Sequence, residues 1–220
     1  MSFIKENINK IKSNIPKNVT LVAVSKTYSN SAVLEAYEAG QKVFGENKVQ
    51  ELVSKYEALP KDIEWHMIGH LQTNKVKHIA PFVHLIHGID SLKLLTEVNK
   101  RAKSTERNIN VLLQIHIAKE ETKFGFSEEE VLSLFQSDEL NKLTSTTVVG
   151  LMGMATNTDN EEQIRNEFKD LKRLFQKLSI SHNKLTILSM GMSGDYKIAI
   201  EEGSTMIRIG SSIFGQRNYN

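Results

Sequence analysis

Short apolar runs of strand length recur along the whole chain, separated by longer segments in which apolar residues return every three or four positions. In the first such segment, Ile4, Ile8 and Ile11 stand at helical spacing among polar residues, and Pro16 interrupts the pattern. Strand-like runs follow at residues 20–24, 43–44, 63–68, 83–87, 109–117, 147–152, 185–190 and 205–209. The pattern predicts a leading helix and then eight strands that alternate with helices.

Two of the intervening helices carry clear signals at their ends. Ser127 and Glu130 have the spacing of a capping box. Residues 161–178 combine an apolar face with acidic residues in the first turn and basic residues late, which suits the helix dipole. Asp90 and Asp195 are also expected to begin helices, because aspartate is a favoured N-cap residue.

The alternation of strands and helices predicts parallel pairing, because a parallel neighbour needs a long crossover connection. Eight such units average about 27 residues each, within the size range of a (β/α)8 barrel. Only three prolines occur and no glycine- and serine-rich linker interrupts the chain, so residues 1–220 are expected to form a single domain. A doubly wound open sheet is the main alternative.

Composition narrows the classes of function. Lysine and arginine number 28 against 26 acidic residues, and the net charge of +2 is spread along the chain, so no nucleic-acid partner is expected. The absence of cysteine excludes disulfides and thiol chemistry and fits a reducing cytosol. No apolar stretch has the length of a signal peptide or of a membrane span. We therefore expect a cytoplasmic protein with no membrane partner.

One lysine stands where a barrel would place reactive groups. The site of a (β/α)8 barrel lies at the C-terminal ends of its strands, and Lys26 directly follows the apolar run of the first strand. Partial burial at the barrel mouth disfavours the charged form of an amine and favours a nucleophile that forms imines with aldehydes. An ordinary surface lysine is the alternative in a chain this rich in lysine.

Glycine and serine residues gather at the ends of the last two predicted strands, in MGMSGD (190–195) and RIGSS (208–212). Glycine lets the backbone approach a ligand closely, and Ser193 and Ser211 offer hydroxyl and N–H groups. A short helix beginning near Ser211 would add its positive end. The two segments predict a phosphate-binding site, with ordinary turns as the alternative.

Arg208 lies inside the last predicted strand between apolar residues, where an unpaired guanidinium would be costly. It therefore needs a carboxylate or a ligand atom as partner, and an ion pair across the barrel is the structural alternative.

Four histidines form two pairs along the chain, His66 with His70 and His84 with His87. Such spacing can indicate metal ligands, but Gly69 interrupts the first pair and the second lies inside a strand pattern. No metal site is therefore expected.

Five segments closely resemble the pyridoxal phosphate homeostasis proteins: VSKT (24–27), FGENKVQE (44–51), EWHMIGHLQTNK (64–75), LSMGMSGDYKIAI (188–200) and GSTMIRIGSSIFG (203–215). The likeness covers nearly the whole chain in the same order. That family is similar to the N-terminal barrel of bacterial alanine racemase, the fold-type III class of pyridoxal 5′-phosphate (PLP) proteins. The resemblance implies a single PLP-binding (β/α)8 barrel without the C-terminal β-domain of the racemases.

The resemblance also assigns cofactor-binding roles to six residues: Lys26 as the lysine of the internal aldimine, Ser193, Gly210 and Ser211 at the phosphate, Arg208 facing the pyridine nitrogen, and Asn47 beside the cofactor. A permanently cationic group at that nitrogen disfavours a proton there and makes the ring a weaker electron sink. In racemases a tyrosine from the β-domain supplies a second base, whereas this chain ends at Asn220. No catalytic residue is therefore assigned.

The function implied by the resemblance is that of a carrier or regulator in intracellular PLP homeostasis, affecting amino-acid and vitamin B6 metabolism, without robust catalysis of its own. PLP itself is the expected small-molecule partner, enzymes that lack their PLP are the expected recipients, and the protein is expected to be a monomer. Two alternatives remain. One is a PLP-dependent racemase or related enzyme, and the other is an aldolase that uses the lysine without a cofactor.

Overall fold

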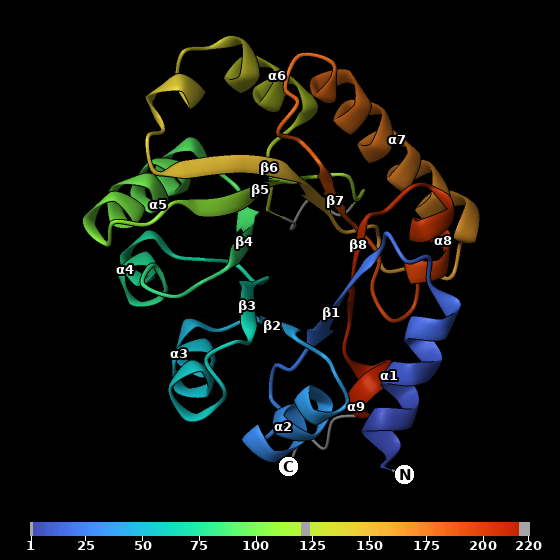
Figure 1. Cartoon of the computed structure of the whole chain (residues 1–220). Coiled ribbons are helices and arrows are strands. Elements are labelled where there is room, and N and C mark those ends of the chain that lie inside the picture. The colour runs from blue at the N-terminus through green and yellow to red at the C-terminus, as the bar shows by residue number, and fades with distance from the viewer. Residues whose placement is uncertain (1, 120–123, 216–220) are drawn as a thin grey trace.

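The computed structural model describes residues 2–119 and 124–215. In this part of the chain eight parallel strands close into a barrel in the order β1 to β8, with helices arranged around its outside (Figure 1). The barrel closes because the last strand pairs with the first, with Thr20 opposite Met206 and Ala23 opposite Ile209. The predicted (β/α)8 barrel is confirmed, and the open doubly wound sheet is excluded.

Each strand overlaps one of the apolar runs in the sequence. The strands are β1 (Thr20–Val24), β2 (Val43–Glu46), β3 (Glu64–Met67), β4 (Leu85–Ile89), β5 (Ile109–Ile115), β6 (Thr146–Gly153), β7 (Ile187–Ser189) and β8 (Met206–Ile209). The connecting helices are α1 (Phe3–Asn14), α2 (Asn30–Glu38), α3 (Val49–Ala58), α4 (Val76–Ile79), α5 (Leu92–Ser104), α6 (Glu128–Gln136), α7 (Glu161–Ser179), α8 (Tyr196–Glu201) and α9 (Ser211–Phe214), with short 3₁₀ turns η1 (Thr73–Lys75) and η2 (Leu140–Lys142).

The predicted start of α6 is confirmed, since Ser127 and Glu130 form both hydrogen bonds of a capping box. The N-cap of α5 is Ser91, whose hydroxyl accepts from the backbone N–H of Leu94, so the expectation for Asp90 was wrong. The Asp90 carboxylate lies 3.1 Å from His70 Nδ1 and contacts that side chain instead. Asp195 does hold the N-cap position of α8.

Alternation of side chains along the strands divides the core in two. A small apolar cluster fills the barrel interior and consists of Val22, Leu85, Leu112, Met152 and Met206. A much larger cluster lies between the strands and the helices and includes Trp65 on β3 and Phe168 on α7. Polar side chains that share the interior phase of a strand are therefore held inside the barrel, which is where the site forms.

Within the described ranges, no helix has both the length and the apolar character needed to cross a membrane.

Candidate functional site

The six residues singled out from the sequence lie at the C-terminal ends of four strands that are neighbours in the barrel: Lys26 after β1, Asn47 after β2, Ser193 between β7 and α8, Arg208 in β8, Gly210 directly after β8, and Ser211 at the start of α9. Barrel closure therefore brings residues from the early and the late parts of the sequence together at the C-terminal rim of the barrel. Lys26, Asn47 and Ser193 are partly buried, Gly210 is buried, and Ser211 is exposed.

The segments after β7 and β8 meet at the end of β1. The backbone N–H of Gly210 donates to Ser193 Oγ at 3.3 Å. A Cβ atom on Gly210 would lie only 3.2 Å from the carbonyl oxygen of Val24, so glycine permits a close approach here. The first turn of α9 begins at Ser211, beside the same contact. Hydroxyl groups, backbone N–H groups and a helix start thus converge two residues from Lys26, which is an arrangement suited to an anion.

Arg208 is buried in the barrel interior and is held by two neutral oxygens. Its Nη1 donates to Ser189 Oγ at 2.6 Å, and its Nη2 donates to the carbonyl oxygen of Gly153 at 3.1 Å. Burial lowers the pKa of Arg208 to about 10, partly offset by the nearby Asp195 carboxylate, so the guanidinium remains a cation at neutral pH. Among the described residues, the hydrogen-bond partners of Arg208 are a hydroxyl and a carbonyl group, and not a carboxylate across the barrel. The ion pair that was the structural alternative therefore does not form.

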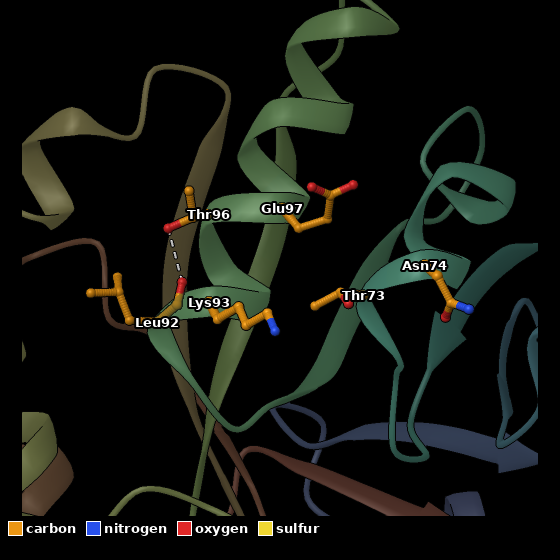
Figure 2. A pocket seen from close by; sticks show the side chains of 6 residues that line it. All are labelled: Thr73, Asn74, Leu92, Lys93, Thr96 and Glu97. Carbon is orange, nitrogen blue, oxygen red and sulfur yellow. Dashed lines mark hydrogen bonds between the residues drawn. The ribbon is translucent and has the colours of Figure 1, made fainter.

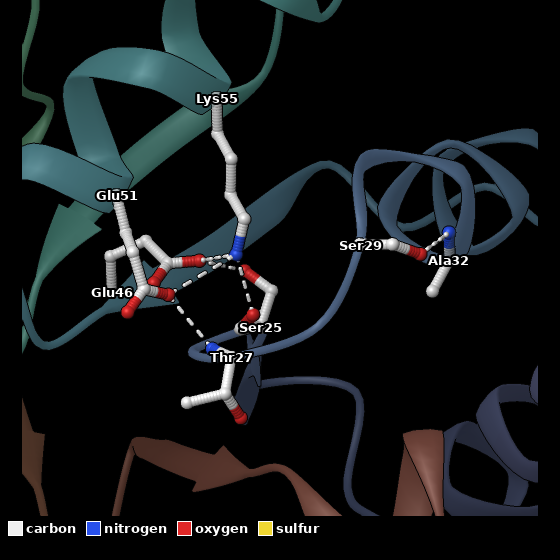
Figure 3. Close-up of polar contacts among 7 residues, drawn as sticks. All are labelled: Ser25, Thr27, Ser29, Ala32, Glu46, Glu51 and Lys55. Carbon is white, nitrogen blue, oxygen red and sulfur yellow. Dashed lines mark hydrogen bonds and ion pairs between the residues drawn. The ribbon is translucent and has the colours of Figure 1, made fainter. Parts of the chain in front are cut away.

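A buried polar network fixes the residue that precedes Lys26 (Figure 3). The ammonium group of Lys55 on α3 donates to the carbonyl oxygen of Ser25 and to Glu46 Oε1, each at 2.6 Å. The Ser25 hydroxyl donates to the same carboxylate oxygen at 2.6 Å. Lys55 and Glu46 are both almost fully buried, so this ion pair is shielded from solvent.

The residue that follows Lys26 is fixed by the same helix. Thr27 has a φ of 70°, a left-handed conformation that costs a residue with a side chain of order 1 kcal/mol or more. Its N–H donates to Glu51 Oε2 at 2.8 Å, and Glu51 in turn lies 3.7 Å from Lys55 (Figure 3). Both neighbours of Lys26 are therefore anchored to α3, which limits the positions that its backbone can take.

Sequence reasoning missed this network, although α3 carried a signal for it. Lys55 continues the buried face of Val49 and Leu52 at three-residue spacing, where an apolar side chain is the usual choice. Burial raises the pKa of Glu46, opposed by its charge and hydrogen bond with Lys55. Its Oε2 atom is buried and has no hydrogen-bond partner among the described residues.

A second series of buried polar side chains runs from Ser189, which is a partner of Arg208, across the barrel to His66. His87 Nδ1 lies 3.2 Å from Ser189 Oγ, and His87 Nε2 lies 3.0 Å from His66 Nδ1. Burial, together with the neighbouring His84, lowers the pKa of His66 to about 3, and burial also lowers the pKa of His87 well below its usual value. Both rings are therefore neutral at neutral pH.

The histidine pairs suggested by sequence spacing are not the pairs that form. His70 lies against Asp90 and stacks on the ring of Phe124 with centroids 4.6 Å apart, away from His66. His66 pairs with His87 and stacks on His84, both from the next strand segment. The contacts run between strands and not along them.

Asn47 is positioned by its backbone. A Cβ atom on Gly69 would lie 2.5 Å from the Asn47 carbonyl oxygen, so the turn after β3 packs directly on the turn after β2. We assign no role to His116, and Lys123 lies outside the described residues.

A cleft of about 570 Å³ lies elsewhere on the molecule, on the outer side between η1 and α5. Figure 2 shows its lining side chains, which are Thr73, Asn74, Leu92, Lys93, Thr96 and Glu97. None of the six candidate residues lines it, so the cleft has no part in the site at the barrel mouth.

Comparison with known proteins shows the family to which the chain belongs. The family described as alanine racemase, N-terminal domain, matches residues 1–218. A protein of Vibrio alginolyticus named pyridoxal phosphate homeostasis protein is 41% identical over 235 residues, covering 100% of both chains. One from Aquifex aeolicus is 43% identical over 201 residues, covering 90% of this chain and 87% of its own.

Solved structures show the same similarity in three dimensions. PipY of Synechococcus elongatus without PLP is 33% identical, with a TM-score of 0.91 over 96% of this chain and 100% of that chain. The same protein with PLP bound gives a TM-score of 0.87 at 32% identity. An alanine racemase of Clostridium difficile, 17% identical, shares the fold with a TM-score of 0.78, and the match spans 99% of this chain but 56% of the racemase.

Proposed function

Because this chain belongs to the pyridoxal phosphate homeostasis proteins, whose fold is that of the alanine racemase N-terminal domain, we propose that it binds PLP at the barrel mouth. Lys26 is the residue that holds the cofactor covalently. The observation that carries this proposal is the contact between Gly210 and Ser193 at the end of β1, two residues from Lys26. PipY, a solved relative, is described with PLP bound.

In this proposal, different residues at the barrel mouth bind different parts of PLP. Ser193, Gly210 and Ser211 offer hydroxyl and N–H donors to a phosphate, and the start of α9 adds its positive end. Arg208 reaches the barrel interior from β8 as a buried cation and would face the pyridine nitrogen, as the family resemblance implies. Asn47, directly after β2, would lie beside the cofactor.

PLP supplies an aldehyde for imine formation and a ring that can withdraw electrons. Arg208 limits the second property, because a cation beside the pyridine nitrogen disfavours a proton there. The buried network around Ser25 and Thr27 keeps the backbone at Lys26 in place, which limits where the lysine side chain can meet the cofactor.

We infer from these features that the protein carries or regulates PLP in vitamin B6 and amino-acid metabolism, without robust catalysis of its own. In this proposal it acts in the cytoplasm as a monomer, residues 1–220 form one domain, and the recipients of PLP are enzymes that lack it. The shared name of its relatives supports the homeostatic role.

The test is to identify the lysine that carries the cofactor. The protein is loaded with PLP, reduced with borohydride, digested and mapped by mass spectrometry. The phosphopyridoxyl mass is expected on Lys26, and the visible absorbance of the loaded protein should be lost in Lys26→Ala. Lys48→Ala, an exposed lysine near the mouth, is the matched control and should keep both signals. A label on another lysine, or an undiminished visible band in Lys26→Ala, would contradict the proposal.

A further inference from the structure

A second polar cluster lies at the opposite end of the barrel from Lys26. Glu64 is the first residue of β3, and His84 directly precedes β4, so both stand at the rim where the strands begin. His66 lies two residues after Glu64, in the same phase of β3. One ligand atom from each of the three side chains lies within 4.8 Å of the others. The cluster thus brings two imidazoles and a carboxylate together.

One separation in the cluster is close to that between two ligands of a bound ion. His84 Nε2 lies 3.5 Å from Glu64 Oε2, and the rings of His66 and His84 stack at 5.6 Å. Two ligand atoms on a tetrahedral zinc ion with bonds of ~2.0–2.1 Å are ~3.3 Å apart. The Glu64 carboxylate and the His84 ring are both exposed, so both side chains are free to rotate toward that separation.

Burial differs across the cluster in a way that suits an open metal site. The His66 ring is buried, and its Nε2 atom has no hydrogen-bond partner among the described residues. The side chains of Glu64 and His84 are 47% and 51% exposed, so an ion can approach these two side chains from solvent. An unpartnered buried nitrogen is costly, and an ion bound to it would remove that cost.

The hydrogen bonds from Ser189 through His87 to His66 can be donated in either of two directions along the chain. His66 Nε2 has no hydrogen-bond partner among the described residues in either arrangement. Arg208 can only donate to Ser189 Oγ. If the Ser189 hydroxyl donates to His87, then His87 donates to His66 and leaves a buried N–H at His66 Nε2. If the protons run the other way, His66 Nδ1 donates to His87 and Nε2 presents a lone pair. The second direction is the one that a metal ion selects.

We propose that Glu64, His66 and His84 bind a divalent transition-metal ion, Zn²⁺ in the first place, at the N-terminal rim of the barrel. Two histidines and one glutamate form a known ligand set for zinc, with a water molecule in the fourth position. His87 is the partner that orients the buried ligand, as a hydrogen-bonded group commonly does for a metal-bound imidazole. The ion joins the starts of β3 and β4 and lies at the other end of the barrel from the proposed PLP site.

The experiment is a titration of chelator-treated protein with Zn²⁺ by calorimetry and with Co²⁺ by visible absorbance. Wild-type protein is expected to bind one equivalent of each ion, and the Co²⁺ form should show the absorbance of a tetrahedral site. His84→Ala and Glu64→Gln are expected to lower the affinity by at least about ten-fold, since even loss of a partner outside the ligand set typically costs 10–100-fold. His78→Ala, an exposed histidine on α4, is the matched control and should bind like wild type.

The two ligand variants replace exposed side chains, so each is expected to fold, which circular dichroism checks. Nitrogen NMR of the histidine rings gives an independent signal, because bound Zn²⁺ should leave His66 protonated at Nδ1 only. The proposal is overturned if wild-type protein binds neither ion, or if His84→Ala and Glu64→Gln bind with wild-type affinity. It stands apart from the PLP proposal, because Lys26→Ala should bind the metal unchanged.

Discussion

The ammonium group of Lys55 illustrates how a single residue supports the proposed site without contacting the cofactor. It neutralises Glu46 in the barrel wall and holds the Ser25 carbonyl group, while Glu51 holds the N–H of Thr27. A buried charge is tolerated only when it is paired, so Lys55 and Glu46 depend on each other.

Replacing Lys55 by methionine is expected to lower the free energy of unfolding by about 3–5 kcal/mol, because the buried Glu46 carboxylate loses its counter-charge. The double variant Glu46→Gln/Lys55→Met should recover a large part of that loss, since the uncompensated charge is gone. Urea unfolding followed by circular dichroism measures both.

Lys42→Met is the matched control for this prediction, because Lys42 and Asp62 form an exposed pair at 2.6 Å. Its urea midpoint should stay near that of wild type, as exposed pairs contribute little. Equal destabilisation by Lys42→Met and Lys55→Met would show that burial of the Lys55 pair is not what makes it important.

At the scale of elements, the turns after β7 and β8 act as one unit. The first supplies Ser193 and the second supplies Gly210 and the start of α9, and the hydrogen bond between them sets their separation. Neither turn is long, so the strands dictate where they meet. The closeness of Gly210 to Val24 then places the unit at the end of β1.

PLP is therefore expected to bind much more tightly than pyridoxal, which lacks the phosphate. Ser193→Ala should reduce the preference by roughly ten-fold or more, since a hydrogen bond to a charged group contributes about 1.5–3 kcal/mol. Spectral titration with both vitamers measures the preference. Ser181→Ala, beyond the end of α7, is the control that should retain it. Equal affinity of wild-type protein for the two vitamers would remove the case for a phosphate site here.

At the scale of the whole molecule, the two proposed sites lie at opposite ends of the barrel. The C-terminal rim holds the candidate PLP site, the interior holds the chain from Arg208 through Ser189 and His87 to His66, and the N-terminal rim holds the proposed metal site. The similarity to alanine racemase covers the barrel and leaves the rest of that longer chain unmatched.

We expect that the PLP-loaded protein does not racemise alanine at a useful rate. Racemisation needs one base on each face of the Cα atom, and each missing acid–base group typically costs roughly 10²–10⁴ in rate. Lys26 can serve one face, and Arg208 weakens the ring as an electron sink. The measurement is incubation with L-alanine in heavy water, following Cα deuterium and D-alanine. Turnover at the ~1–10³ s⁻¹ typical of enzymes would overturn the carrier function.

The sequence by itself determined the architecture. Apolar runs and helical spacing report local periodicity, and eight alternating units leave few ways to arrange parallel strands, so the barrel and the place of Lys26 at the end of β1 followed from the pattern. The glycine and serine residues near Ser193 and Gly210 were visible for the same reason, because strand ends share one rim.

Only the tertiary structure decided which polar groups meet. Lys55 pairs with Glu46 from a different element, and His66 contacts His87 and His84 while His70 turns away to Asp90. Such contacts depend on the register between neighbouring strands and on barrel closure. Both are set by packing over many residues, so they cannot be read from the spacing of residues along the sequence. The histidine spacing along the chain therefore indicated the wrong pairs, and the cluster at the N-terminal rim emerged only once β3 and β4 lay side by side.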